Sequence, residues 1–207
     1  MSPSFPDPVG GRAKRTFDLA ITVPALILLA PVFVIIAILI RRDSPGSAFY
    51  RQTRVGLDGR EFRVFKFRTM VNGAEFIGAG LHNDAGDPRI TPLGARLRAL
   101  SLDELPQLIN VLIGDMSIVG PRPTLRDQVE LYTPEQRRRL RARPGITGLA
   151  QISGRSTLPW SRRIVIDVHY VDNWSLRLDL EIIARTIPAL LRKDETYPGG
   201  IDEVDLG

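Results

Sequence analysis

The longest hydrophobic pattern in the sequence is an uncharged run of about 22 residues from Leu19 to Ile40. At 1.5 Å per residue, a helix of this length crosses the roughly 30 Å hydrocarbon core of a bilayer. The run is too long for the apolar core of a cleaved signal peptide, and Arg41-Arg42-Asp43 follows it in place of a small-residue cleavage site. We therefore expect a membrane segment that the protein retains.

Basic pairs stand on both sides of this run, Lys14-Arg15 before it and Arg41-Arg42 after it. The positive-inside rule disfavours translocation of either end, and Pro24 and Pro31 each remove a helical hydrogen bond within the run. These features favour a kinked, re-entrant helix with both ends in the cytoplasm. A plain spanning anchor is the alternative, because transmembrane helices tolerate prolines.

Two further segments predict a hairpin and a loop. The stretches Ala48–Val55 and Glu61–Met70 flank Asp58-Gly59, a strong turn signal, so a small β-hairpin is expected. Residues Gly73–Thr91 are rich in Gly and Asp and have no periodicity. We interpret them as a loop that orders around the substrate.

Two amphipathic helices are predicted downstream. One has its apolar positions at i, i+3, i+4 and i+7, which are Leu105, Leu108, Ile109 and Leu112. The other carries a stripe formed by Leu180, Ile183, Ile187, Leu190 and Leu191. Periodicity alone does not decide whether the second helix lies in the membrane interface or faces a core.

With 207 residues and ordinary globular composition, the chain predicts one catalytic domain. We expect a disordered tail at 1–13, a re-entrant membrane helix at 14–42, a cytoplasmic domain at 43–195 and a C-terminal tail at 196–207. The predicted fold is mixed α/β and mostly helical: a monotopic membrane protein with interfacial amphipathic helices and a small β-hairpin sheet.

The composition of the chain argues against several kinds of active site. The absence of cysteine excludes disulfides and thiolate sites, and two isolated histidines, His82 and His169, make zinc hydrolysis or a Ser-His triad improbable. A net charge of +5 implies an anionic partner. Five arginines between Pro134 and Arg143 suit anionic lipid headgroups, although a solvated face is the simpler interpretation.

Adjacent carboxylates at Asp103-Glu104 begin the first amphipathic helix. They point about 100° apart on a helix, so one can attack or bind metal while the other supports it. A structural alternative is a capping box between Ser101 and Glu104. Pro106 complicates that alternative by disrupting a regular first turn.

Arginines beside proline or glycine are candidates for binding phosphate, because a planar guanidinium on a stiff backbone grips two oxygens. They are Arg89, Arg122 and Arg155, and Arg122 has proline on both sides.

At these residues the chain resembles the bacterial sugar transferases, the small monotopic phosphoglycosyl transferases. The matching blocks run in family order: Lys14–Asp18, Lys66–Met70, Asp87–Thr91, Ser101–Gln107, Gly114–Ser117 with Val119–Pro123, and Arg143–Gly148. One departure is Ala30-Pro31, where the family often has Ser-Pro at the helix break, so the break here would rest on proline sterics alone.

The resemblance implies that Asp103 attacks the sugar-linked phosphate of a UDP-sugar, forms an aspartyl phosphosugar and releases UMP. Undecaprenyl phosphate then takes the phosphosugar at the cytoplasmic face of the bacterial inner membrane, in a first membrane step of polysaccharide or glycoconjugate assembly. It implies Mg²⁺ bound by Asp103 and Glu104, and phosphate binding by Arg122 and Arg98, with Arg89 and Arg155 behind them. Phospholipid is an expected partner, nucleic acid is not, and a homodimer is one oligomeric state open to the chain.

Two other functions compete with this one. A membrane-tethered basic module that binds nucleic acid or anionic lipid explains the charge but leaves Asp103-Glu104 without a role. A glycosyltransferase that moves only the sugar would release UDP rather than UMP, so the product distinguishes it.

Overall fold

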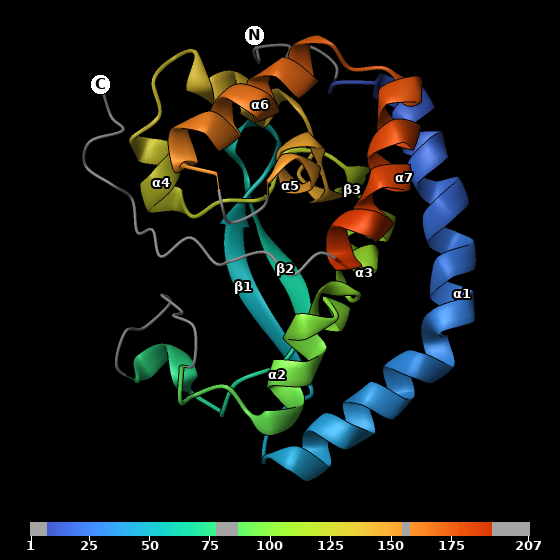
Figure 1. The fold of residues 1–207 in the computed structure, drawn as a ribbon, viewed down its shortest axis with the longest axis vertical. Helices are drawn as coiled ribbons and strands as arrows, with labels where there is room; N and C mark the ends of the chain where they lie inside the picture. The colour runs from blue at the N-terminus through green and yellow to red at the C-terminus, as the bar shows by residue number, and fades with distance from the viewer. Residues whose placement is uncertain (1–7, 78–86, 155–157, 192–207) are drawn as a thin grey trace, which may run out of the picture.

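The computed structural model describes residues 8–77, 87–154 and 158–191. Within them the fold is mixed α/β and mostly helical, as predicted, and it contains two small two-stranded sheets where one was expected (Figure 1). The α-helices are α1 (Gly11–Asp43), α2 (Pro92–Ala99), α3 (Gln107–Ile113), α4 (Arg126–Glu130), α5 (Leu149–Ser153), α6 (Trp160–Asp172) and α7 (Leu176–Leu191). The strands are β1 (Phe49–Val55), β2 (Glu61–Phe67), β3 (Ser117–Val119) and β4 (Gly145–Thr147).

The N-terminal helix α1 is longer than the apolar run and lies along one side of the domain (Figure 1). It has 33 residues and contains Pro24 and Pro31, and Figure 1 shows it bending partway along its length. Its first half packs on the core formed by α3 and β3, and its second half packs on α2 and the hairpin. Both halves therefore contact the same domain, while the outward face exposes large apolar side chains such as Ile27, Leu28 and Val34.

The N-terminal end of α1 is fixed to the domain by a buried ion pair. Lys14 Nζ lies 2.6 Å from Asp179 Oδ2 of α7, and their side chains are only 4% and 0% exposed. Tyr170 and Trp174 also donate hydrogen bonds to Asp179. Lys14, which precedes the apolar run in the sequence, is thus turned into the domain, because Asp179 offers it a desolvated partner.

Arg15, the second cation of that pair, also points inward. It donates hydrogen bonds to the carbonyl oxygens of Val111 and Leu112 near the end of α3, at 2.5 and 2.8 Å. A helix leaves its last carbonyls without partners, and a guanidinium can satisfy two of them. By contrast, Arg41 and Arg42 at the other end of α1 are exposed.

The predicted β-hairpin is confirmed. Strands β1 and β2 pair antiparallel from Phe49↔Phe67 to Val55↔Glu61. Asp58 and Gly59 both have positive φ, 53° and 76°, which the tight turns of hairpins require. The following loop is described only in part: it contains a short 3-10 turn at Ala74–Phe76, and its residues 78–86 lie outside the described part of the chain.

A second sheet, which the hydrophobic pattern does not predict, joins two of the motif blocks. Strand β3 pairs parallel with β4 through Ser117↔Gly145 and Val119↔Thr147. A Cβ at Gly120 would lie 2.2 Å from the carbonyl oxygen of Arg143, so only glycine permits this approach. The pairing fixes the chain just before Arg122.

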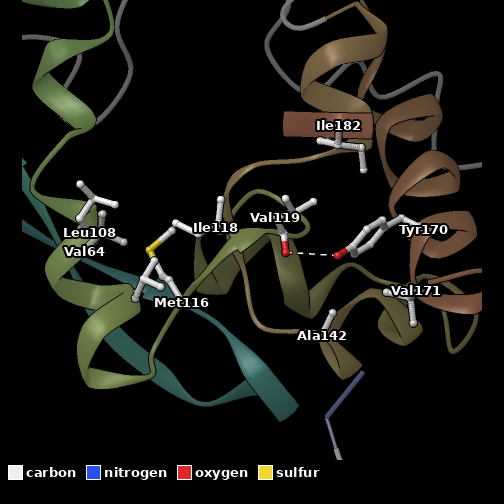
Figure 2. Close-up of a cluster of buried hydrophobic side chains, with 10 residues drawn as sticks. Val64, Leu108, Met116, Ile118, Val119, Ala142, Tyr170, Val171 and Ile182 are labelled. Carbon is white, nitrogen blue, oxygen red and sulfur yellow. Dashed lines mark hydrogen bonds between the residues drawn. The ribbon is translucent and has the colours of Figure 1, made fainter. Parts of the chain in front are cut away.

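The main core lies around β3, where α3, α6 and α7 converge (Figure 2). Met116, Val119, Tyr170 and Ile182 are completely buried there. The Tyr170 hydroxyl lies 3.2 Å from the carbonyl oxygen of Val119, drawn as a dashed line in Figure 2, and shares its one proton between that oxygen and Asp179 Oδ1 at 2.7 Å. This contact ties α6 to the strand that leads to Arg122.

The two predicted amphipathic helices differ in outcome. Helix α3 forms and buries Leu108, while Leu112 is exposed. In α7 the stripe is not one buried face: Leu180 and Ile187 are exposed, Ile183 is half-buried, and Ile182 enters the core. The apolar positions of α7 extend around more of the helix than the stripe assumed, so it presents one apolar side to the core and another outward.

Candidate active site

A cavity of about 860 Å³ opens between the hairpin, the Asp103 turn and the N-terminal part of α6. Its described lining contains seven basic side chains and three acidic ones. The basic residues are Arg54, Lys66, Arg68, Arg98, Arg122, Arg139 and Arg163, and the acidic ones are Asp103, Glu104 and Asp167. An excess of positive charge in a partly enclosed space attracts a polyanion.

The Asp103-Glu104 pair sits on an irregular turn before α3, not in its first regular turn. Residues Leu102–Glu104 form a 3-10 turn, and α3 begins at Gln107 after Pro106. Ser101 has a left-handed backbone, with φ 54°, and its side chain makes no capping hydrogen bond to a described residue. The capping-box interpretation is therefore wrong, because the hydroxyl geometry it requires is absent from this turn and the Glu104 side chain is directed into the cavity.

Glu104 bridges two cations. Its Oε1 lies 2.8 Å from Lys66 Nζ and 2.9 Å from Arg122 Nη2, while its side chain is 18% exposed. Burial alone would raise the pKa of Glu104, but the charges of Arg122 and Lys66 outweigh burial and lower the pKa. Glu104 is therefore ionised and holds Arg122 and Lys66 together in the cavity.

Asp103 has the opposite environment. Its carboxylate is half-buried and accepts no hydrogen bond from another described side chain. Burial raises its pKa, the charge of Glu104 raises it further, and Lys66 and Arg98 partly offset both. The two neighbouring carboxylates thus differ in their contacts: Glu104 binds two cations, whereas the oxygens of Asp103 have no side-chain partner among the described residues and are available to a substrate.

The backbone at Arg122 is held by a buried network that sequence patterns did not indicate. Arg139 donates to the carbonyl oxygen of Arg122 at 3.0 Å and to Asp167 at 2.5 Å. The side chains of Arg139 and Asp167 are each 3% exposed, and Tyr132 accepts a further bond from Arg139 at 2.6 Å. Arg122 itself remains 55% exposed, so its backbone is fixed while its guanidinium is accessible.

Tertiary contacts engage several of the arginines between residues 137 and 143. Arg139 is buried, Arg138 pairs with Glu135 and Asp172, and Arg143 donates to the carbonyl oxygen of Gly114. Arg137 and Arg141 are exposed. The run is therefore not a continuous cationic surface, because Arg139 and Arg143 turn toward internal acceptors and Arg138 is paired with two carboxylates nearer the surface.

The other predicted phosphate-binding arginines have different positions. Arg98 lines the cavity, and its Nε donates to the Thr69 hydroxyl at 2.8 Å. Arg89 is not among the residues that line the cavity: it is 6% exposed and binds the Asp87 carboxylate and the carbonyl oxygens of Ala74 and Ile77. These acceptors engage its guanidinium, and binding of a substrate phosphate by Arg89 stays a prediction. Arg155 lies outside the described residues.

Lys66 belongs to the motif block Lys66–Met70, but its sequence context predicted no role for it. Alternation along the second hairpin arm places it on the side of Val64, facing the interior. A lysine at an inward position is rarely buried without an acidic partner. That signal alone would have pointed to an ion pair, although not to Glu104 as its partner.

Oxygen ligands for a divalent cation are few here. No cluster of three or more metal-binding side chains occurs among the described residues. Asp103 fits as a ligand, because its carboxylate has no side-chain partner there, whereas Glu104 is engaged by Lys66 and Arg122. Mg²⁺ commonly binds proteins through one or two carboxylates and completes its shell with water and substrate phosphates, so Asp103 is the described carboxylate of the pair that could hold it.

Comparison with known proteins places this arrangement in a family. The bacterial sugar transferase family matches residues 9–193. The chain is 44% identical to the exopolysaccharide production protein ExoY of Sinorhizobium fredii, over 92% of this chain and 90% of that protein. It is 44% identical to the UDP-glucose:undecaprenyl-phosphate glucose-1-phosphate transferase of Caulobacter vibrioides, over 89% and 72%. It is 42% identical to the undecaprenyl-phosphate galactose phosphotransferase of Salmonella typhimurium, over 89% and 41%. This chain belongs to the bacterial sugar transferase family.

Proposed function

We propose that this transferase moves a sugar 1-phosphate from a UDP-sugar to undecaprenyl phosphate and releases UMP. The observation that carries the proposal is the contrast at Asp103-Glu104, where one carboxylate is neutralised by two cations and its neighbour is free of side-chain partners in the described cavity. The donor and acceptor named for the Caulobacter and Salmonella relatives support the same substrates here.

In the first step an oxygen of Asp103 bonds to the sugar-linked phosphorus, and the bond from that phosphorus to the bridging oxygen breaks. The electron pair leaves with UMP, and an aspartyl phosphosugar remains. In the second step an oxygen of undecaprenyl phosphate attacks the same phosphorus and releases the Asp103 carboxylate. The product is undecaprenyl diphosphate sugar, and two displacements replace one difficult direct transfer.

The cavity's own cations act on charge and orientation. A carboxylate approaching a diphosphate meets repulsion, which Lys66, Arg98 and Arg122 reduce by surrounding the reacting centre. Glu104 keeps Lys66 and Arg122 in place, so we assign it a positioning role. When bound at Asp103, Mg²⁺ would supply further positive charge at the phosphate oxygens.

Helix α1 supports a placement of the protein at the membrane. Both of its halves contact one domain, so a straight crossing would carry part of that domain into the bilayer. Contact with lipid is supported by exposed apolar residues on three helices. They lie on the outward face of α1, at Leu112 and Ile113 of α3, and at Leu180 and Ile187 of α7. We infer a monotopic enzyme on the cytoplasmic face of the inner membrane, where UDP-sugars are made.

Single cysteines test this topology, because the chain has none of its own. We expect Ala13→Cys and Ser47→Cys, at exposed positions on either side of the apolar part of α1, to resist an impermeant maleimide in intact spheroplasts. Both should react once the membrane is opened. Ser153→Cys, exposed on the domain, is the matched internal control. Labelling of Ala13→Cys from outside would show that the helix spans the membrane and that the re-entrant arrangement is wrong.

The function itself is tested by a screen of UDP-sugars with purified protein, Mg²⁺ and undecaprenyl phosphate. We expect UMP from at least one donor and a lipid product that retains the sugar phosphate. Release of UDP would instead indicate transfer of the sugar alone. No turnover with any donor, together with retained binding to anionic vesicles, would favour the tethered basic module.

A further inference from the structure

Strand β1 turns one row of side chains toward the cavity. Tyr50, Gln52 and Arg54 alternate with exposed Arg51 and Thr53, and all three inward residues line the cavity. A strand directs alternate side chains to opposite faces, so this row is set by the register of the hairpin. Arg54, at the far end of the row from Tyr50, has no place in the reaction steps above.

Arg54 lacks a charged partner in the described structure. Its Nη2 donates to the neutral Gln52 amide oxygen at 2.7 Å, and no described carboxylate lies within ion-pair distance. Its side chain is half-buried. A guanidinium removed from water prefers an anion, and a single amide oxygen satisfies only one of its five N–H donors.

Arg54 interacts with the charges of two site residues. Burial and, to a smaller extent, the charge of Arg122 lower its pKa to about 10, while Tyr50 and Glu104 act in the opposite direction. It therefore stays charged near neutral pH. Arg122 is paired with Glu104 at 2.9 Å, and Arg54 lines the same cavity close enough to both residues to interact with their charges.

We propose that Arg54, together with Arg122, binds the nucleoside-linked phosphate of the donor, the phosphate that leaves as part of UMP. This assignment rests on the proposed function. A UDP-sugar carries two phosphates in series, and the sugar-linked one must lie at Asp103. Its neighbour then extends toward Arg122, which is held by Glu104, and toward Arg54, which has no carboxylate partner among the described residues. There Arg54 stabilises the charge that the departing phosphate gains when the bridging bond breaks.

Arg54→Gln tests the proposal through direct binding of UMP and of uridine to the purified full-length protein. We expect UMP to bind at least about tenfold more weakly, whereas uridine, which has no phosphate, should bind as in the wild type. Arg51→Gln is the matched control: it removes the same charge from the same strand, but on the outward face, where Arg51 stacks on Phe65. It should leave both affinities unchanged.

Two further measurements separate a loss of phosphate binding from a loss of folding: the unfolding temperature of Arg54→Gln and the UMP affinity of Arg54→Lys. The lysine variant keeps the charge and should recover part of the UMP affinity. The assignment would be overturned if Arg54→Gln bound UMP as the wild type does, or if it bound UMP and uridine equally more weakly. In either case the proposed function would stand as long as the wild-type protein released UMP from a donor. A wild-type protein that neither binds UMP nor releases it from any donor would overturn both.

Discussion

Replacing Asp103 with asparagine is expected to reduce turnover by more than about 1000-fold, equivalent to roughly 4 kcal/mol in the barrier. The amide has nearly the same shape as the carboxylate but is a far poorer nucleophile, so the fold should persist while the aspartyl phosphosugar no longer forms. Turnover is measured as UMP release, and the adduct by intact-protein mass spectrometry after incubation with donor alone. The wild type should gain the mass of one sugar phosphate.

Asp127→Asn is the matched control for this change, because Asp127 is an exposed carboxylate on α4 outside the cavity lining. It should retain full activity and the adduct. If Asp103→Asn kept activity within about tenfold, a barrier change of roughly 1.4 kcal/mol, Asp103 would not be the nucleophile. Loss of the adduct together with a lower unfolding temperature would point to a structural role instead.

Arg122→Lys is expected to lower kcat/KM for the donor by about 10- to 100-fold, or roughly 1.4 to 2.8 kcal/mol. Lysine keeps the positive charge but loses the planar fork, which here reaches both oxygens of Glu104, at 2.9 and 3.5 Å. The substitution therefore loosens Glu104 as well as the grip on phosphate. Because the Arg122 side chain is 55% exposed, stability should change little.

Arg126→Lys provides the comparison for Arg122→Lys. Arg126 is also an exposed arginine paired with a glutamate, with Nε 2.9 Å from Glu61 Oε1, but it lies outside the cavity lining. Its replacement should leave donor kinetics as in the wild type. Equal, small effects of the two substitutions would make Arg122 a residue of a surface turn and remove it from the phosphate site.

Local patterns were sufficient for several features of this protein. The uncharged run predicted the apolar part of α1, and Asp58-Gly59 predicted the hairpin, because each depends on residues close together in the chain. The Asp103-Glu104 pair and Arg122 could be chosen for their chemistry and flanking residues. Sequence similarity then identified the family, since its motif blocks extend along most of the chain.

Other features depend on which distant residues pack together. Lys14 meets Asp179 across 165 positions, and Arg139 meets Asp167 across 28. Its neighbouring proline marked Arg89 as a phosphate-binding candidate, yet it is held by Asp87, whereas Arg98, which has no such neighbour, lines the cavity. A charged side chain is directed by the partner that offsets its desolvation, and that partner is brought to it only by the tertiary fold. The sequence therefore determined which groups are available for chemistry, and packing decided which of them face the substrate.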